Sequence, residues 1–248
     1  MSKLNDLPFA TLQFYTTAPY DCSYLEGRTA RSQVATPSHA IDTATYSSLI
    51  NRGFRRSGSF TYRPLCTKCK ECIPVRINAK SFKKSKSQKR VWNKLFYSLN
   101  FRIRAPEFST EHYHLYSKYQ ASRHSGGGMD TDSREQYKHF LLQSNVDTSL
   151  IEFREATGRL RMISIIDNLS DGISSVYTFF DPSNKKLSFG IFNILWQVEY
   201  CKSLGLEFLY LGYYIKKSKK MAYKTKFQPL QGLVNGIWTA MPKQEQIK

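Results

Sequence analysis

The order of secondary-structure elements expected in the second half of the chain restricts its fold more than any other sequence feature. Three strand-like stretches follow one another there, and Asp171-Gly172 between the last two is a hairpin signal. A strongly apolar helix over 190–204 and a strand over 208–214 come next. An antiparallel meander followed by a helix and a strand indicates an α+β fold rather than a doubly wound parallel sheet. The three strand-like stretches are 150–154, 159–167 and 173–180.

The first half of the chain contains shorter predicted elements. Asp42 is the N-cap candidate of a short helix that ends at Gly53, and alternating residues over 54–62 predict a strand or hairpin. A short strand is expected over 73–77, whereas residues 1–40, rich in Ser, Thr and Pro, are expected to be irregular.

Three more helices and a boundary complete the expected organisation. Helices are predicted over 86–99, 110–123 and 133–143. Arg104-Ala-Pro106 interrupts the pattern, because the residue before a proline disfavours helix. We therefore predict two domains, residues 1–105 and residues 106–248.

The positive charge of the chain is concentrated in two segments. The sequence has 37 Lys and Arg against 19 Asp and Glu, a formal net charge of +18. Residues 52–104 contain sixteen Lys and Arg and one acid, and residues 216–226 contain six Lys and no acid. Each segment alone could be a solvated surface, but together they hold the whole imbalance and favour a joint polyanion-binding surface.

Aromatic residues lie inside both basic segments, for example Trp92 in the first and Tyr223 in the second. Rings beside cations suit unpaired nucleotides, which offer a face for stacking, better than a closed duplex. No run of about 18 apolar residues exists and neither segment reads as a long amphipathic helix, so we expect no membrane partner. The N-terminus lacks a basic segment followed by an apolar one, and a cytoplasmic protein is expected.

The sharpest local motif is Cys66-Thr-Lys-Cys69-Lys-Glu-Cys72. Three thiols within seven residues can converge on one soft metal, and Cys22 is available as the fourth ligand of a tetrahedral site. The same spacing occurs in iron–sulfur ligation, so zinc and a cluster are both open. Reduced thiols or a redox pair are the alternative.

The ordered set of motifs along the chain resembles the arginyl-tRNA–protein transferase family. Cys22–Ala35 and His124–Asp130 are similar to segments of its short bacterial branch, the aspartate/glutamate leucyltransferases, although Leu25-Glu26-Gly27 stands where that branch has Leu-Pro-Gly. The other matching segments are Gly53–Gly58, Tyr62–Pro64, Pro74–Arg76, Ser85–Arg90, Ser174–Pro182, Leu187–Gly190, Tyr210–Ile215 and Lys220–Lys224.

This resemblance implies a transferase that moves leucine from leucyl-tRNA to the α-amine of proteins with N-terminal Asp or Glu, marking them for degradation through the N-end rule. It also implies a small N-terminal cysteine-containing domain and a C-terminal N-acyltransferase-like (GNAT-type) domain with a mainly antiparallel sheet and flanking helices. Transfer itself is expected to require no cofactor, because the aminoacyl ester is already activated. A zinc ion or iron–sulfur cluster on the cysteines stays open.

Site residues follow from that chemistry as hypotheses. Asp181 is the candidate proton acceptor, with an ordinary turn as the alternative for Asp181-Pro182, and Tyr213 or a backbone N–H on its strand is the candidate support for the oxyanion. Arginine suits the carboxylate of the acceptor better than lysine does. The candidates for this contact are Arg55, Arg56, Arg63, Arg76, Arg28 and Arg31. The candidates for tRNA binding are Lys83, Lys84, Lys86, Lys89, Arg90, Lys216, Lys217, Lys220, Tyr223 and Lys224, with Tyr223 and Lys224 nearest the terminal adenosine.

Two other functions remain open at this point. The same fold could use an arginyl donor or acyl-CoA, or the chain could be a non-catalytic nucleic-acid-binding module with a zinc knuckle. The second alternative explains the charge and the cysteines but gives no reason for the nearly neutral remainder of the second half.

Overall fold

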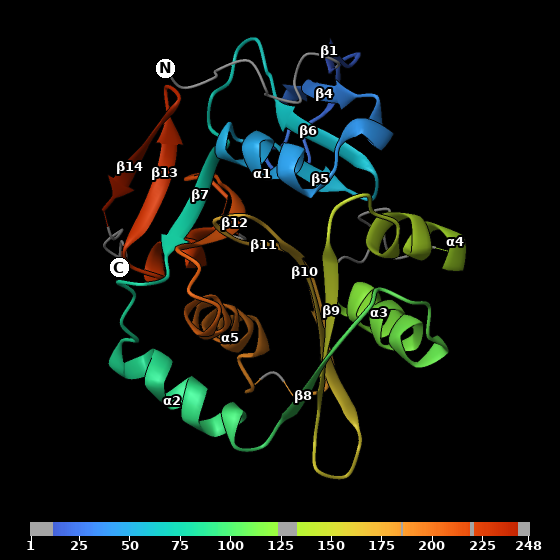
Figure 1. The fold of residues 1–248 in the computed structure, drawn as a ribbon, viewed down its shortest axis with the longest axis vertical. Helices are drawn as coiled ribbons and strands as arrows, with labels where there is room; N and C mark the ends of the chain where they lie inside the picture. The colour runs from blue at the N-terminus through green and yellow to red at the C-terminus, as the bar shows by residue number, and fades with distance from the viewer. Residues whose placement is uncertain (1–11, 124–132, 185, 219–220, 243–248) are drawn as a thin grey trace, which may run out of the picture.

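A computed structural model describes residues 12–123, 133–184, 186–218 and 221–242 (Figure 1). Its centre is an eight-stranded sheet in the order β14-β13-β7-β12-β11-β10-β9-β8. The strands are β7 (Ile73–Asn78), β8 (Asn100–Arg104), β9 (Thr148–Arg154), β10 (Leu160–Asn168), β11 (Gly172–Phe180), β12 (Phe208–Tyr214), β13 (Leu230–Val234) and β14 (Ile237–Met241).

The sheet is antiparallel except for one pair. β11 and β12 run parallel and are joined by the helix α5 (Phe189–Ser203), whose length a parallel connection requires. The fold class predicted from the sequence, α+β with a mainly antiparallel sheet and flanking helices, is thus confirmed. β7 pairs with both β12 and β13, so the sheet takes strands from both sides of the expected boundary at residues 105 and 106.

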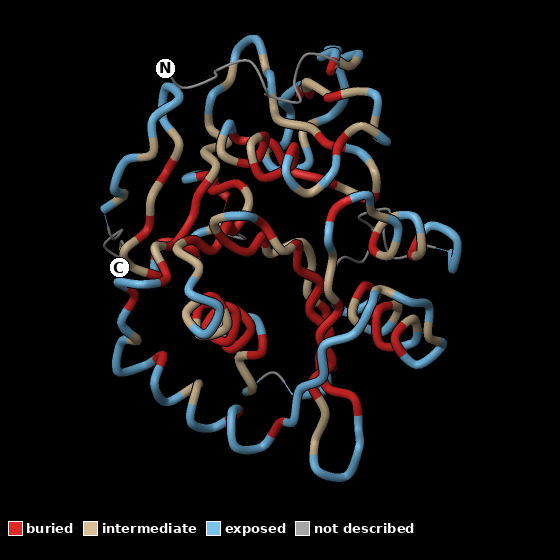
Figure 2. The backbone as a smooth tube through the Cα atoms, in the orientation of Figure 1, coloured by how far each residue is buried: buried red, intermediate tan, exposed pale blue. Residues whose placement is uncertain are grey.

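Helices cover both faces of this sheet (Figure 1). α5 and α2 (Lys86–Phe96) pack on one face, where α5 buries residues around its whole circumference because its sequence is apolar on every side. α3 (Thr110–Arg123), α4 (Arg134–Tyr137) and the π-helical turn η3 (Lys138–Leu142) cover the other face at β10 and β11. Figure 2 shows the buried residues concentrated along the central strands and α5.

A smaller four-stranded antiparallel sheet lies beside α1 (Thr43–Asn51) at the top of Figure 1. Its strands, in order, are β1 (Gln13–Thr16), β4 (Ser32–Thr36), β6 (Phe60–Pro64) and β5 (Arg55–Ser57). β2 (Tyr20–Asp21) and β3 (Thr29–Ala30) form a separate two-stranded ladder. The expectation that residues 1–40 are irregular is therefore wrong at the four strands β1, β2, β3 and β4. They are specified by pairing rather than by their own alternation: β1 pairs with β4, β4 pairs with β6, and β2 pairs with β3.

Most elements expected from the sequence are present. Asp42 caps α1 by accepting a hydrogen bond from the Thr45 amide at 2.8 Å, and β10 and β11 form the hairpin signalled by Asp171-Gly172. The helix expected over 133–143 begins at Arg134 and passes into η3.

Candidate functional site

Arg55 is the centre of a buried cationic cluster where the small sheet meets the large one. It lies on β5 with 7% of its surface exposed, and its Nη1 donates to the Ser174 hydroxyl on β11 at 3.1 Å. Its Nη2 is buried without a hydrogen-bond partner among the described residues. Lys224, in the 3₁₀ helix η4 (Ala222–Lys226), is close enough for its pKa to respond to Arg55.

Lys224 is itself buried, with 4% of its surface exposed. Its Nζ donates to the backbone carbonyl of Tyr213 at 2.5 Å. Burial first, and then repulsion from Arg55, lower the pKa of Lys224 to about 7, so the amine carries a full charge near neutrality only if an anion comes near.

β11 and β12 separate beside this cluster. Only Gly172–Ser174 pairs with Phe208–Tyr210, although β11 continues to Phe180 and β12 to Tyr214. Within the described chain, the last four residues of β12 therefore have no partner strand on the β11 side, while β7 pairs with their other side. Backbone N–H groups without a strand partner are suited to bind an oxyanion.

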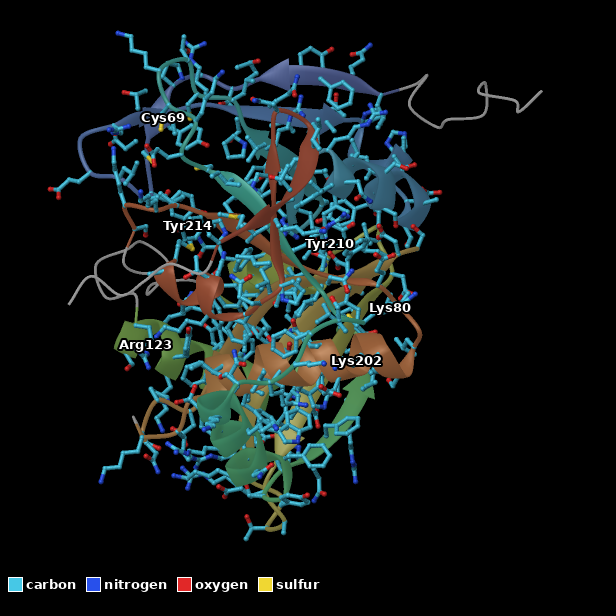
Figure 3. All side chains as sticks on the ribbon, turned by 90° about the vertical axis from the view of Figure 1, so that its left-hand side faces the viewer. Cys69, Lys80, Arg123, Lys202, Tyr210 and Tyr214 are labelled. Atoms are coloured by element: carbon cyan, nitrogen blue, oxygen red, sulfur yellow. The ribbon has the colours of Figure 1, made fainter. Side chains whose placement is uncertain are left out.

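Cys22 and the three motif cysteines line one cavity of about 490 Å³ together with Tyr213 and Arg28. Figure 3 shows Cys69 on the same side of the molecule as Tyr214. Burial, and then the neighbouring thiols, raise the pKa of Cys72. In the chain ranges described, no group of three or more His, Cys, Asp or Glu residues is arranged to hold a metal ion.

The two basic segments are neighbours in the fold. The Gln88 side chain in α2 donates to the carbonyl of Lys226 at 3.1 Å, and Lys217 lies 3.5 Å from Glu71 of the cysteine loop. Phe82 and Phe227 stack with ring centroids 6.3 Å apart.

The candidate tRNA-binding residues differ in exposure. Lys84 is half-buried and pairs with Glu199 at 2.5 Å, and Lys224 is buried as described above. Lys220, like the segment His124–Asp130, lies outside the described residues. The exposed candidates are Lys83, Lys86, Lys89, Arg90, Lys216, Lys217 and Tyr223.

The candidate acceptor-binding arginines also differ. Arg56 is buried and clamps Asp167, with Nε 2.8 Å from Oδ2 and Nη2 2.5 Å from Oδ1. Arg76 is bonded to Gln231 at 2.8 Å and lies 3.4 Å above the Phe208 ring. These partners occupy the guanidinium groups of Arg56 and Arg76, so both arginines stabilise the packing of the fold.

The remaining three arginines lie nearer the surface. Arg63 donates to Gln33 at 2.9 Å and to the carbonyl of Arg52 at 3.0 Å. Arg28 and Arg31 are exposed, and Arg28 lies 3.5 Å from the Cys69 sulfur.

Asp181 accepts from Lys118 at 2.9 Å and pairs with Arg159 at 2.7 Å and Arg161 at 3.3 Å. Burial alone would raise its pKa, but the hydrogen bonds from Lys118 and the Ser183 amide hold the pKa well below the usual range. A carboxylate held in this way is a weak proton acceptor.

Tyr213 donates its hydroxyl hydrogen to the Gly53 carbonyl at 2.9 Å, and burial raises its pKa well above the usual value. This bond uses the one hydrogen of the hydroxyl, so the backbone of β12 is the better candidate for the oxyanion.

Sequence reasoning did not find Ser174, Asp167 or Gly212 as parts of this region. Each is contributed by a strand of the large sheet, and none stands in a motif with a chemical spacing. Only the meeting of β5 with β10, β11 and β12 brings them to Arg55 and Arg56.

This fold and site define an α+β protein with one β–α–β crossover in an antiparallel sheet and an excess of buried cations where two sheets meet. Family comparison then identifies it further. The N-terminal model of the arginine-tRNA-protein transferase family matches residues 20–90, and the C-terminal model matches residues 111–234. The chain belongs to this family and is a transferase.

Two relatives that are similar over nearly their whole length have the same name. A relative from Nitrosospira multiformis, named aspartate/glutamate leucyltransferase, is 61% identical over 96% of this chain and 94% of its own length. A relative of the same name from Polynucleobacter asymbioticus is 52% identical over 97% of this chain and 99% of its own length.

Solved structures are similar only distantly. The structure of L-PGS from Bacillus licheniformis has a TM-score of 0.46 at 12% identity and covers 59% of this chain and 46% of that one. FemX has a TM-score of 0.46 at 8% identity and covers 84% of this chain and 81% of that one.

Proposed function

We propose that this protein transfers leucine from leucyl-tRNA to the α-amino group of proteins that begin with Asp or Glu. The observation that carries the proposal is the name aspartate/glutamate leucyltransferase on relatives that match nearly end to end, at up to 61% identity. Membership of a transferase family disfavours the non-catalytic nucleic-acid-binding module. We place the reaction in the cytoplasm, where aminoacyl-tRNA is made. No helix within the described ranges is long and apolar enough to cross a membrane.

The tRNA is proposed to lie across the exposed cations that the two basic segments bring together. Lys86, Lys89 and Arg90 are exposed on α2, and Lys216 and Lys217 are exposed after β12. Phosphate contacts of this kind weaken steeply as salt concentration rises, so tRNA binding is expected to do the same.

The chemistry needs positioning more than a nucleophile. The acceptor α-amine, with an ordinary pKa of about 7.7–8.0, is partly neutral at cellular pH and can attack the activated ester directly. Backbone N–H groups at the end of β12, where β11 has separated from it, are proposed to bind the developing oxyanion. Holding amine and ester together supplies much of the acceleration.

A metal on Cys22, Cys66, Cys69 and Cys72 remains a separate proposal. Four thiols around one cavity offer the soft donor set that zinc and iron–sulfur clusters prefer. The described arrangement does not converge on an ion, so no step of transfer is assigned to a metal.

The test is a mass measurement of the product. The protein is incubated with an Asp-initiated peptide and with leucyl-, arginyl- or methionyl-tRNA in separate reactions, and the peptide is weighed. We expect a gain of one leucine residue with leucyl-tRNA alone. The matched control is the same peptide with an acetylated N-terminus, which offers no amine and is expected to gain nothing.

Other outcomes assign the function elsewhere. A gain of one arginine residue would replace the donor, and no gain with any donor would refute the proposal.

A further inference from the structure

Arg55 presents an unsatisfied donor group inside the protein. One nitrogen is bonded to Ser174, but Nη2 has no partner among the described residues and is shielded from water. Removing a charged group from water is unfavourable unless a partner of opposite charge compensates. Buried cations are therefore normally matched by an anion.

Lys224 adds a second cation beside Arg55. Its Nζ donates to a neutral group, the carbonyl of Tyr213. The buried carboxylate of Asp167 on β10 lies beside Arg56, and its two oxygens are already bound by Arg56 and Thr148. Asp167 is thus paired with Arg56, whereas among the described residues neither Arg55 nor Lys224 forms an ion pair with a carboxylate.

Gly212 lies next to both cations, and its missing side chain leaves them room for no more than a contact with a Cβ. A methyl group on its Cα would lie 3.9 Å from Arg55 Nε and 3.9 Å from Lys224 Nζ, with no other atom beyond its chain neighbours within 4 Å. Gly212 adopts φ +79°, which places a β-bulge opposite β7 and turns the strand at this point. The two nitrogen atoms thus flank one small space at the position where β11 and β12 separate.

We propose that Arg55 and Lys224 form the specificity site that binds the side-chain carboxylate of the acceptor's N-terminal Asp or Glu. This inference rests on the proposed function and selects Arg55 from the six arginines considered. The guanidinium fork and the amine supply donors from two directions, which matches the two oxygens of a carboxylate.

An acceptor carboxylate suits these two buried cations better than a tRNA phosphate does. Both cations are more than nine-tenths buried, and a phosphodiester would bring two nucleosides with it, whereas an Asp or Glu side chain is slender. The acceptor amine is only a few bonds from that carboxylate, so binding here places the amine beside the end of β12 proposed to hold the ester. Burial has lowered the pKa of Lys224, and a bound carboxylate would favour the protonated amine again.

The experiment compares two peptides that differ only in their first residue, Asp or Asn. Leucine transfer is measured as kcat/KM for each peptide with wild type, Arg55→Gln and Lys224→Gln. We expect each substitution to lower the preference for Asp by about 10- to 100-fold, through KM of the Asp peptide, while KM for leucyl-tRNA is unchanged. Lys226→Gln, which removes an exposed lysine from the same short helix, is the matched control and is expected to keep the preference.

Thermal melting separates this role from a structural one. Because each substitution removes a buried cation that has no carboxylate partner among the residues described, the variants are expected to melt no lower than wild type. If Arg55→Gln does not fold, Arg55→Lys, which keeps the charge but loses the fork, is expected to give an intermediate preference.

Two results would overturn the inference. The first is an unchanged Asp preference in both folded variants. The second is an equal loss with Asp and Asn peptides together with a higher KM for leucyl-tRNA, which would assign the cations to a phosphate. Failure of the proposed function gives a different result, since wild type would then transfer leucine to neither peptide.

Discussion

Replacing Arg56 by Met tests whether this arginine serves the fold rather than the substrate. In the native protein Arg56 and Asp167 form a two-point ion pair whose side chains are 2% and 0% exposed. Thr148 donates a further hydrogen bond to the carboxylate at 2.9 Å. Arg56→Met removes the cation and leaves Asp167 in the interior.

The magnitude follows from this burial. Removing one partner of a buried pair costs about 3–5 kcal/mol, because the remaining charge is uncompensated. Burial already raises the pKa of Asp167, opposed by Arg56, so without Arg56 the carboxyl is expected to take up a proton instead of staying charged. For a chain of this length each kcal/mol lowers Tm by about 2–4 °C, which predicts a fall of about 6–20 °C.

The assay is unfolding in urea, followed by circular dichroism, with Tm as a second measure. Arg56→Met/Asp167→Asn is the control, because it also removes the stranded carboxylate and is expected to recover at least half of the loss. If Arg56→Met keeps the wild-type free energy of unfolding but loses the preference for Asp-initiated peptides, the structural role is refuted and Arg56 is a binding residue.

Three further predictions concern separate features. Asp181→Asn is expected to lower the free energy of unfolding by about 1–2 kcal/mol at pH 7. Because the pKa of Asp181 is depressed in the folded protein, the difference in unfolding free energy between wild type and variant should shrink as pH falls below about 4. A difference that stays constant with pH would contradict the ion pairs. Gly172→Ala places a Cβ 2.2 Å from the Phe208 carbonyl oxygen and should lower stability by about 1–3 kcal/mol in urea melts, whereas Gly190→Ala, with open space in a helix, should not. Cys72→Ser should lower the bound zinc or iron measured by mass spectrometry to less than half of the wild-type content, and metal-free wild type would end the metal proposal.

Local sequence signals were sufficient for most secondary structure. The Asp42 cap, the Asp171-Gly172 hairpin and the apolar run of α5 each act within a few residues, so their patterns are legible in the chain itself. The clustering of cysteines and the two basic segments are likewise properties of the sequence. The strands β1 and β4 were missed because they are held by pairing across the chain: β1 pairs with β4, and β4 pairs with β6, which lies further along the chain.

The sequence by itself determined the fold class, the family resemblance and the set of arginines and lysines from which a site could be built. It could not rank them, since Arg56 and Arg76 find partners 111 and 155 positions away, and no local pattern records such contacts. Only the tertiary structure decided that Arg56 is matched by Asp167, while Arg55 and Lys224 are buried with no hydrogen-bonded carboxylate in the part of the chain that the structure describes. The physical reason is that the burial of a charged side chain and its partners decide whether it stabilises the fold or is free to bind a ligand. Both are set when strands that are distant in sequence pack together.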